Sequence, residues 1–127
     1  MRDLIVLLSV IVSMCGCLND MGQQIPVSQP ANAESISRAA VQGRTVSFLV
    51  VCTLPTPCWE FVRSEHAIAG PNIAVTVIVR PLNGDPCIQV LSHVEAPATI
   101  VVPSAGTYMF HFWRYGNSSL DTTLTFQ

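Results

Sequence analysis

Beyond Gly43 the chain is divided into short runs in which apolar and polar residues alternate, and clusters of Pro, Gly and Asn separate the runs. A period of two is typical of β-strands, because successive side chains on a strand point to opposite faces of the sheet. The separators, such as Leu54-Pro55-Thr56-Pro57, are rich in turn-forming residues. The pattern predicts seven strands, at residues 45–52, 59–69, 73–80, 88–95, 99–102, 107–115 and 120–126.

Each predicted strand has one apolar face. Val46, Phe48 and Val50 share a face of the first strand, and Phe110 and Phe112 share a face of the sixth. Two sheets packed face to face bury such faces most completely. We therefore expect an all-β domain, an antiparallel β-sandwich of about seven strands that resembles the immunoglobulin-like and fibronectin-like sandwiches. The Cys-Trp-Cys spacing of true immunoglobulin domains is absent, and a small closed barrel is the alternative.

The composition limits the size and the partners of the domain. The chain has 127 residues, enough for one domain, which we expect at residues 44–127. Six Arg and no Lys stand against eight Asp and Glu, so the formal net charge is −2 and the basic residues are scattered. This pattern argues against nucleic-acid binding and against a polybasic membrane patch.

The N-terminus has the layout of a secretory signal. A charged head, Met1-Arg2-Asp3, precedes an apolar run from Leu4 to Met14, which is too short to cross a hydrocarbon core that needs roughly 20 residues. The run ends in Met14-Cys15-Gly16-Cys17, which resembles the lipobox of bacterial lipoproteins, with Met14 where Leu is usual. An alternative is cleavage at Ala31-Asn32-Ala33, which would release a soluble protein.

The resemblance to bacterial lipoproteins implies a signal at residues 1–17 and a lipid on Cys17, while Cys15 marks a poorer second register. It also implies a lipid-anchored location in the bacterial cell envelope. Leu18 follows the lipidated cysteine in place of the Asp that retains such proteins in the inner membrane, which favours the outer membrane.

Between the signal and the predicted sandwich, residues 18–43 are polar and contain few large apolar side chains. Such a segment buries too little apolar surface to offset its ordering entropy, so we expect a flexible tether. Residues 34–41 are compatible with a short helix or with an additional edge strand.

Three cysteines remain after the signal, and an oxidising compartment favours one disulfide among them. Cys58 and Cys87 each follow a proline at the start of a predicted strand, and we favour this pair, which leaves Cys52 as the free thiol. The pairing of Cys52 with Cys58 is the alternative. The chain-entropy estimate for a loop of about 30 residues is roughly 3 kcal/mol.

Sites for chemistry are not evident. His66, His93 and His111 are isolated on different strands, and the cysteines lack the spacing of metal ligands, so we expect neither a metal nor another cofactor. Nucleophile elbows, paired-carboxylate motifs and phosphate-binding Gly-rich loops are likewise absent from the sequence, so we expect no enzyme.

The strongest indication of a binding surface is aromatic. Trp113 and Tyr115, with Arg114 between them, lie where the sixth predicted strand meets the Gly116-Asn117 turn. Aromatic rings offer a large stacking area with a polar edge, which suits a sugar or a peptide. The hypothesis is an envelope protein with a binding or structural role toward another envelope protein or a polysaccharide. The alternative is a protease inhibitor or a copper- or zinc-handling lipoprotein.

Overall fold

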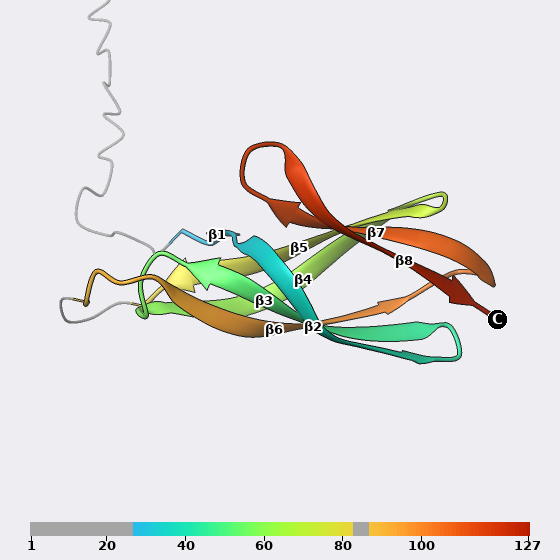
Figure 1. Cartoon of the computed structure of the whole chain (residues 1–127), viewed down its shortest axis with the longest axis horizontal. Helices are drawn as coiled ribbons and strands as arrows, with labels where there is room; N and C mark the ends of the chain where they lie inside the picture. Colours follow the sequence, from blue (N-terminus) through green and yellow to red (C-terminus); the bar gives the residue numbers. More distant parts are fainter. Residues whose placement is uncertain (1–26, 83–86) are drawn as a thin grey trace, which may run out of the picture.

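The computed structural model describes residues 27–82 and 87–127, which form eight β-strands and no helix (Figure 1). The predicted signal and its Cys17 lie outside these residues. Within the described part of the chain, no helix is long and apolar enough to cross a membrane. The strands are β1 (Gln29–Pro30), β2 (Asn32–Gln42), β3 (Thr45–Leu54), β4 (Trp59–Ala69), β5 (Asn72–Pro81), β6 (Ser92–Val101), β7 (Gly106–Arg114) and β8 (Ser118–Phe126).

The strands form two sheets, which confirms the predicted all-β sandwich. In the five-stranded sheet, called sheet A here, β5 pairs with β4 on one side and with β1 and β7 on the other, and β8 lies beyond β7. In the three-stranded sheet, sheet B, β3 lies between β2 and β6.

One pairing corrects the expectation of a wholly antiparallel sandwich. Residues 72–75 of β5 pair in parallel with residues 109–112 of β7. The reason is that β6 belongs to sheet B, where it pairs with β3, so between β5 and β7 the chain runs the length of the sandwich once, in the other sheet. It therefore returns to sheet A at the end where β5 began.

The core lies between the two sheets and is built from the predicted apolar faces. Phe48 of β3 meets Phe110 and Phe112 of β7 edge-on, with ring centroids 5.1 and 5.0 Å apart. All three side chains are fully buried. The alternation read from the sequence therefore assigned the faces of these strands correctly.

The ordered domain begins earlier than expected. Residues 29–42, which we assigned to the tether, form β1 and β2, and residues 34–41 belong to an edge strand. The chain passes from sheet A to sheet B at Ala31, whose amide donates to Val77 O at 2.8 Å. Ala31 and Ala33 are only 2% and 1% exposed. Alanines bury little apolar surface each, which is why the pattern did not reveal these strands.

β6 replaces two predicted strands. The sequence predicted a break near Pro97, but Ser92–Val101 is continuous, and residues 88–91 lie outside any strand. Pro97 lies opposite Leu49, and its carbonyl accepts a hydrogen bond from Ser64 Oγ of β4 at 2.7 Å. The carbonyl group of Pro97 therefore points away from β3. Because β6 is an edge strand of sheet B, the missing N–H removes no ladder hydrogen bond.

Tyr108 fastens the connection between β6 and β7. Its hydroxyl donates to Ser104 O at 3.0 Å, four residues upstream, and its ring is buried against Phe126. This bond from a tyrosine near the start of a strand to the preceding corner is similar to the tyrosine corner found in some β-sandwiches. Tyr108 alternates with Phe110 and Phe112 on the apolar face of the strand, but its bond to Ser104 has no signal in the sequence pattern.

Cys52 is the free cysteine of the described residues and lies in the core with 0% exposure. Burial raises the pKa of its thiol from 9.0 to about 12, because the thiolate would lose its hydration. The thiol therefore stays protonated and packs as a small apolar group.

This raised pKa predicts a loss of stability in alkali. Between pH 9.0 and about 12 the unfolded chain releases the Cys52 proton while the folded chain keeps it, so the free energy of unfolding falls as the pH rises. Urea unfolding from pH 8 to 10.5 checks this, with Cys52→Ala as the control that lacks the titrating group. The prediction would be contradicted if the free energy of unfolding changed with pH equally in wild type and in Cys52→Ala.

Candidate functional site

Trp113 and Tyr115 form an aromatic pair at the end of β7. Their ring centroids are 5.3 Å apart with an interplanar angle of 85°. Trp113 follows the buried Phe112, so it lies on the outer face of sheet A, where it is partly buried. Tyr115 begins the turn to β8 and is 52% exposed. The predicted aromatic residues are therefore together and accessible.

The turn that carries Tyr115 is held at both sides. The Tyr115 amide donates to Asn32 Oδ1 at 3.0 Å, and Ser118 Oγ donates to Tyr115 O at 2.9 Å. Gly116 and Asn117 both have positive φ, 73° and 57°, a conformation that Gly and Asn adopt at the least cost. These bonds fix the backbone beneath the aromatic pair.

Arg114 does not share this face. Side chains alternate along a strand, so Arg114 lies on the same side of sheet A as Phe112 and on the opposite side from Trp113. We therefore leave Arg114 out of the candidate site.

A chain of hydrogen bonds lies beside the aromatic pair on the same outer face. His111 Nδ1 donates to Asp121 Oδ1 at 2.7 Å, and Ser119 Oγ donates to the same oxygen at 2.6 Å. His111 Nε2 lies 3.0 Å from Asn72 Oδ1. Ser119 is the cross-strand neighbour of Trp113, so the network adjoins the aromatic pair directly.

The network also affects the charge of the carboxyl group. The Ser119 hydroxyl, and then His111, hold the pKa of Asp121 below its ordinary value, because both donate to the carboxylate. The Asp121 side chain is 50% exposed. The face therefore presents a hydrogen-bonded anion next to an aromatic platform.

Replacing Ser119 by alanine is expected to raise the pKa of Asp121 toward 3.8, because it removes the first of these donors. The stabilisation from the network is present above pH 3.8 and is lost as the pH falls through the lowered pKa of the folded state. An NMR titration of the Asp121 carboxyl carbon measures the shift. Ser118→Ala is the matched control, because its hydroxyl bonds to Tyr115 O instead. An unchanged Asp121 pKa in Ser119→Ala would refute the role of the hydroxyl.

A shallow hollow of about 150 Å³ continues the same face across β4 and β5. Small side chains, Ala67 opposite Ala74, form part of its lining, and Glu65 stands beside them opposite Thr76. Ala74 is also the register partner of His111, which joins the hollow to the hydrogen-bond network. We call this combined surface the aromatic–polar face; it consists of Glu65, Ala67, Asn72, Ala74, Thr76, His111, Trp113, Tyr115, Ser119 and Asp121.

The sequence analysis did not identify Asn72, Ser119 or Asp121 as members of a site. Two of them could have been identified from the sequence. Ser119 and Asp121 are two residues apart on the strand that follows the Gly116-Asn117 turn, so their side chains lie on the same face. The position of Asn72 depends on the parallel pairing of β5 with β7, which has no local sequence signal.

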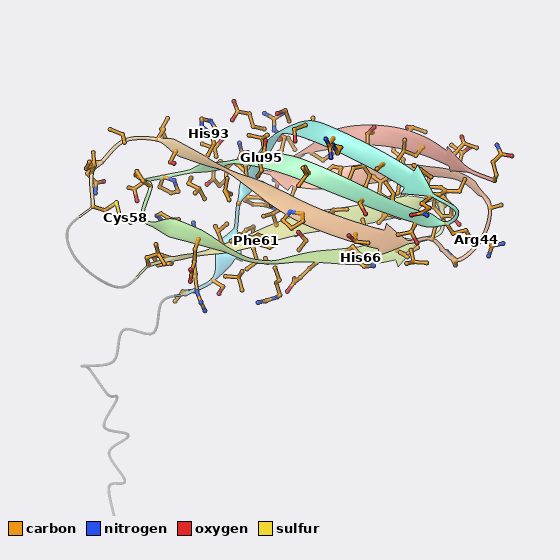
Figure 2. All side chains as sticks on the ribbon, turned by 90° about the horizontal axis from the view of Figure 1, so that it is seen from below. Arg44, Cys58, Phe61, His66, His93 and Glu95 are labelled. Carbon is orange, nitrogen blue, oxygen red and sulfur yellow. A yellow bond between two sulfur atoms is a disulfide. The ribbon has the colours of Figure 1, made fainter. Side chains whose placement is uncertain are left out.

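The predicted disulfide is present between Cys58 and Cys87, with 6.0 Å between their Cα atoms. It joins the start of β4 to the segment that leads into β6, at one end of the long axis of the sandwich, and Figure 2 shows Arg44 at the opposite end. Cys52 is buried elsewhere in the core, so the alternative pairing of Cys52 with Cys58 does not occur.

The three histidines do not converge. His66 lies on β4 and His93 on β6, and Figure 2 shows them well apart, while His111 belongs to the aromatic–polar face. His93 Nε2 lies 2.8 Å from Glu34 Oε2 at the surface of sheet B. Among residues 27–82 and 87–127, no group of three or more His, Cys, Asp or Glu side chains is placed to hold a metal ion.

A second hollow, of about 310 Å³, lies at the end opposite the disulfide, between the Gly70-Pro71 turn and residues 103–108. Its lining is mostly Gly, Ala, Ser and Pro. Tyr108 is the largest side chain in the lining, and its hydroxyl already donates a hydrogen bond to Ser104 O. The aromatic–polar face offers more distinctive chemistry, namely stacking area, an anion and an imidazole.

Comparisons of this chain with protein-family models, with curated proteins and with solved structures each found no match.

Proposed function

We propose that this chain is a lipid-anchored protein of the bacterial cell envelope whose Ig-like domain binds an envelope polysaccharide through the aromatic–polar face. The observation that carries the proposal is the contact of Trp113 with Tyr115, directly beside the hydrogen bonds of Ser119, Asp121 and His111. The bond of Tyr108 to Ser104, which is similar to a tyrosine corner, supports the Ig-like assignment.

The chemistry of this face suits a sugar. The C–H face of a sugar ring packs on an aromatic side chain, and its hydroxyl groups bond to carboxylate, amide and imidazole groups. The shallow hollow next to His111 gives space for a neighbouring sugar residue. A peptide would find few apolar pockets here, which is why we prefer a polysaccharide to an envelope protein as partner.

The anchor follows from the N-terminal sequence. The lipobox-like Met14-Cys15-Gly16-Cys17 assigns the lipid to Cys17, and Leu18 after it favours the outer membrane. Because β1 begins at Gln29, only residues 18–28 separate the lipid from the sandwich. At roughly 3.3 Å per residue, the eleven residues of this segment could span about 36 Å when fully extended.

Metabolic labelling with an alkyne fatty acid tests the anchor in cells that express the full chain. Wild type and Cys15→Ser are expected to carry the label, and Cys17→Ser is expected to lose it. Equal labelling of Cys17→Ser and wild type would overturn the assignment of the lipid to Cys17.

Binding is tested with the detergent-solubilised full chain and two probes, peptidoglycan sacculi and lipopolysaccharide. We expect wild type to bind one of them and Trp113→Ala to bind about tenfold more weakly, a change of about 1.4 kcal/mol. Val101→Ala is the matched control, since Val101 is exposed on the outer face of sheet B. No binding by wild type to either probe, or equal binding by Trp113→Ala, would overturn the proposed function.

A further inference from the structure

One end of the sandwich carries a concentration of exposed aliphatic side chains. Of the ten large hydrophobic side chains that the described residues expose, five lie at the end with the disulfide, and Ile88 and Leu91 are 71% and 74% exposed. Isolated exposed apolar residues are ordinary, but a contiguous group marks an interaction surface. We call this group the apolar tip; it consists of Val27, Leu82, Ile88, Val90 and Leu91.

The tip is held in place. The Cys58–Cys87 disulfide joins the start of β4 to the residue before Ile88. Leu82 N donates to Cys58 O at 2.8 Å, and Val90 N donates to Ile88 O at 3.0 Å. These bonds hold the backbone at Leu82, Cys87 and Val90.

The described chain begins at this same end. Gln29 of β1 pairs with Val79, and the two strands run in opposite directions, so Val27 and Ser28 lie toward Pro81 and Leu82. Figure 1 shows the start of β1 at the end of the sandwich where β5 leads toward β6. The N-terminal residues 1–26, with the apolar run and Cys17, thus attach beside the tip.

We infer that the apolar tip contacts the lipid bilayer, with its aliphatic side chains in the headgroup and upper acyl region. This inference rests on the proposed lipid anchor, which brings the attached end of the domain to the membrane. Among the described residues near the tip, Arg80 and Glu60 are paired with one another. Aliphatic side chains without a basic cluster favour insertion into the interface over electrostatic attachment.

The orientation that follows agrees with the proposed binding role. The Gly70-Pro71 turn and Arg44 lie at the opposite end of the sandwich and would point away from the bilayer (Figure 2). The aromatic–polar face runs along the side of sheet A. A tip resting on the membrane would therefore leave that face open to a polysaccharide.

The test places a tryptophan in the tip. Residues 1–17 are replaced by a hexahistidine tag, which keeps the whole core, because every core residue lies between Ala31 and Phe126. The protein is held on phosphatidylethanolamine–phosphatidylglycerol vesicles by a nickel-chelating lipid, so the result does not depend on lipidation of Cys17. Ile88→Trp is made in a background in which Trp59 and Trp113 are phenylalanine, with Val101→Trp as the matched control on sheet B.

We expect Ile88→Trp to show blue-shifted emission on vesicles and about twofold quenching by lipids brominated in the upper acyl chain, since interfacial segments lie roughly 5–10 Å deep. Val101→Trp should show neither. Equal emission of the two variants on vesicles would overturn the membrane contact. A blue shift of Ile88→Trp that appears without vesicles and grows with protein concentration would assign the tip to contact between copies, which also overturns it. Equal fatty-acid labelling of Cys17→Ser and wild type would refute the lipid anchor. The vesicle measurement would still test the membrane contact, because the nickel-chelating lipid holds the protein there.

Discussion

Replacing Phe48 by alanine is expected to lower the free energy of unfolding by about 3–5 kcal/mol, as is usual for a buried phenylalanine. Phe48 is the side chain of sheet B that meets both Phe110 and Phe112 of sheet A, with centroids about 5 Å away in each case. The alanine would leave a cavity between the sheets and remove two edge-on aromatic contacts. Since small domains have total stabilities of about 5–15 kcal/mol, much of the protein would unfold at moderate temperature.

Urea unfolding followed by circular dichroism measures the effect of Phe48→Ala. Val101→Ala provides the comparison, because Val101 is exposed on an outer face and its truncation leaves no cavity. We expect that variant to stay within about 0.5 kcal/mol of wild type. A loss below about 1 kcal/mol in Phe48→Ala would show that Phe48 is not central to the core.

The double replacement Cys58→Ser/Cys87→Ser is expected to lower the free energy of unfolding by roughly 3 kcal/mol in the chain-entropy model. The two residues are 29 apart in sequence, and their bond closes a loop that contains all of β4 and β5. Both cysteines are replaced together so that neither partner of the bond is left as an unpaired thiol. Urea midpoints of wild type and the double variant give the difference.

Reduction of the wild-type protein supplies the matched control for the disulfide. Cys52 is a free thiol, which dithiothreitol does not reduce, so among the described residues the reagent acts on the Cys58–Cys87 bond. Reduced wild type should therefore match the double variant, and the double variant should be insensitive to dithiothreitol. Equal stability of oxidised and reduced wild type would show that the bond does not constrain the unfolded chain.

Local pattern was sufficient to predict much of this fold. The strand at Trp59–Ala69 was predicted with the same bounds that the structure gives, and the alternation of Val46, Phe48 and Val50 identified the buried face of β3. Side-chain period and turn residues carry this information within a few positions of the chain. The Cys58–Cys87 pair could also be predicted, because each residue follows a proline at the start of a predicted strand.

The features that the sequence did not predict depend on contacts between distant segments. Pro97 indicated a break, but its position at a sheet edge makes a proline harmless to the β3 ladder. Ala31 and Ala33 lie in the core although alanine is a weak apolar signal. The His111–Asn72 contact requires the parallel pairing of β5 and β7, which arises only because β6 joins the other sheet.

The passage of the chain from β1 to β2 also determines how the domain bears mechanical tension. A pull on residue 27 acts first on the two register pairs of β1 with β5 and, through Ala31, on the nine of β2 with β3. The first belong to sheet A and the second to sheet B, so the load passes from one layer to the other. A force applied at the N-terminus must therefore break strand pairs in both sheets in succession: β1 detaches when β5 releases it, and β2 then detaches from β3.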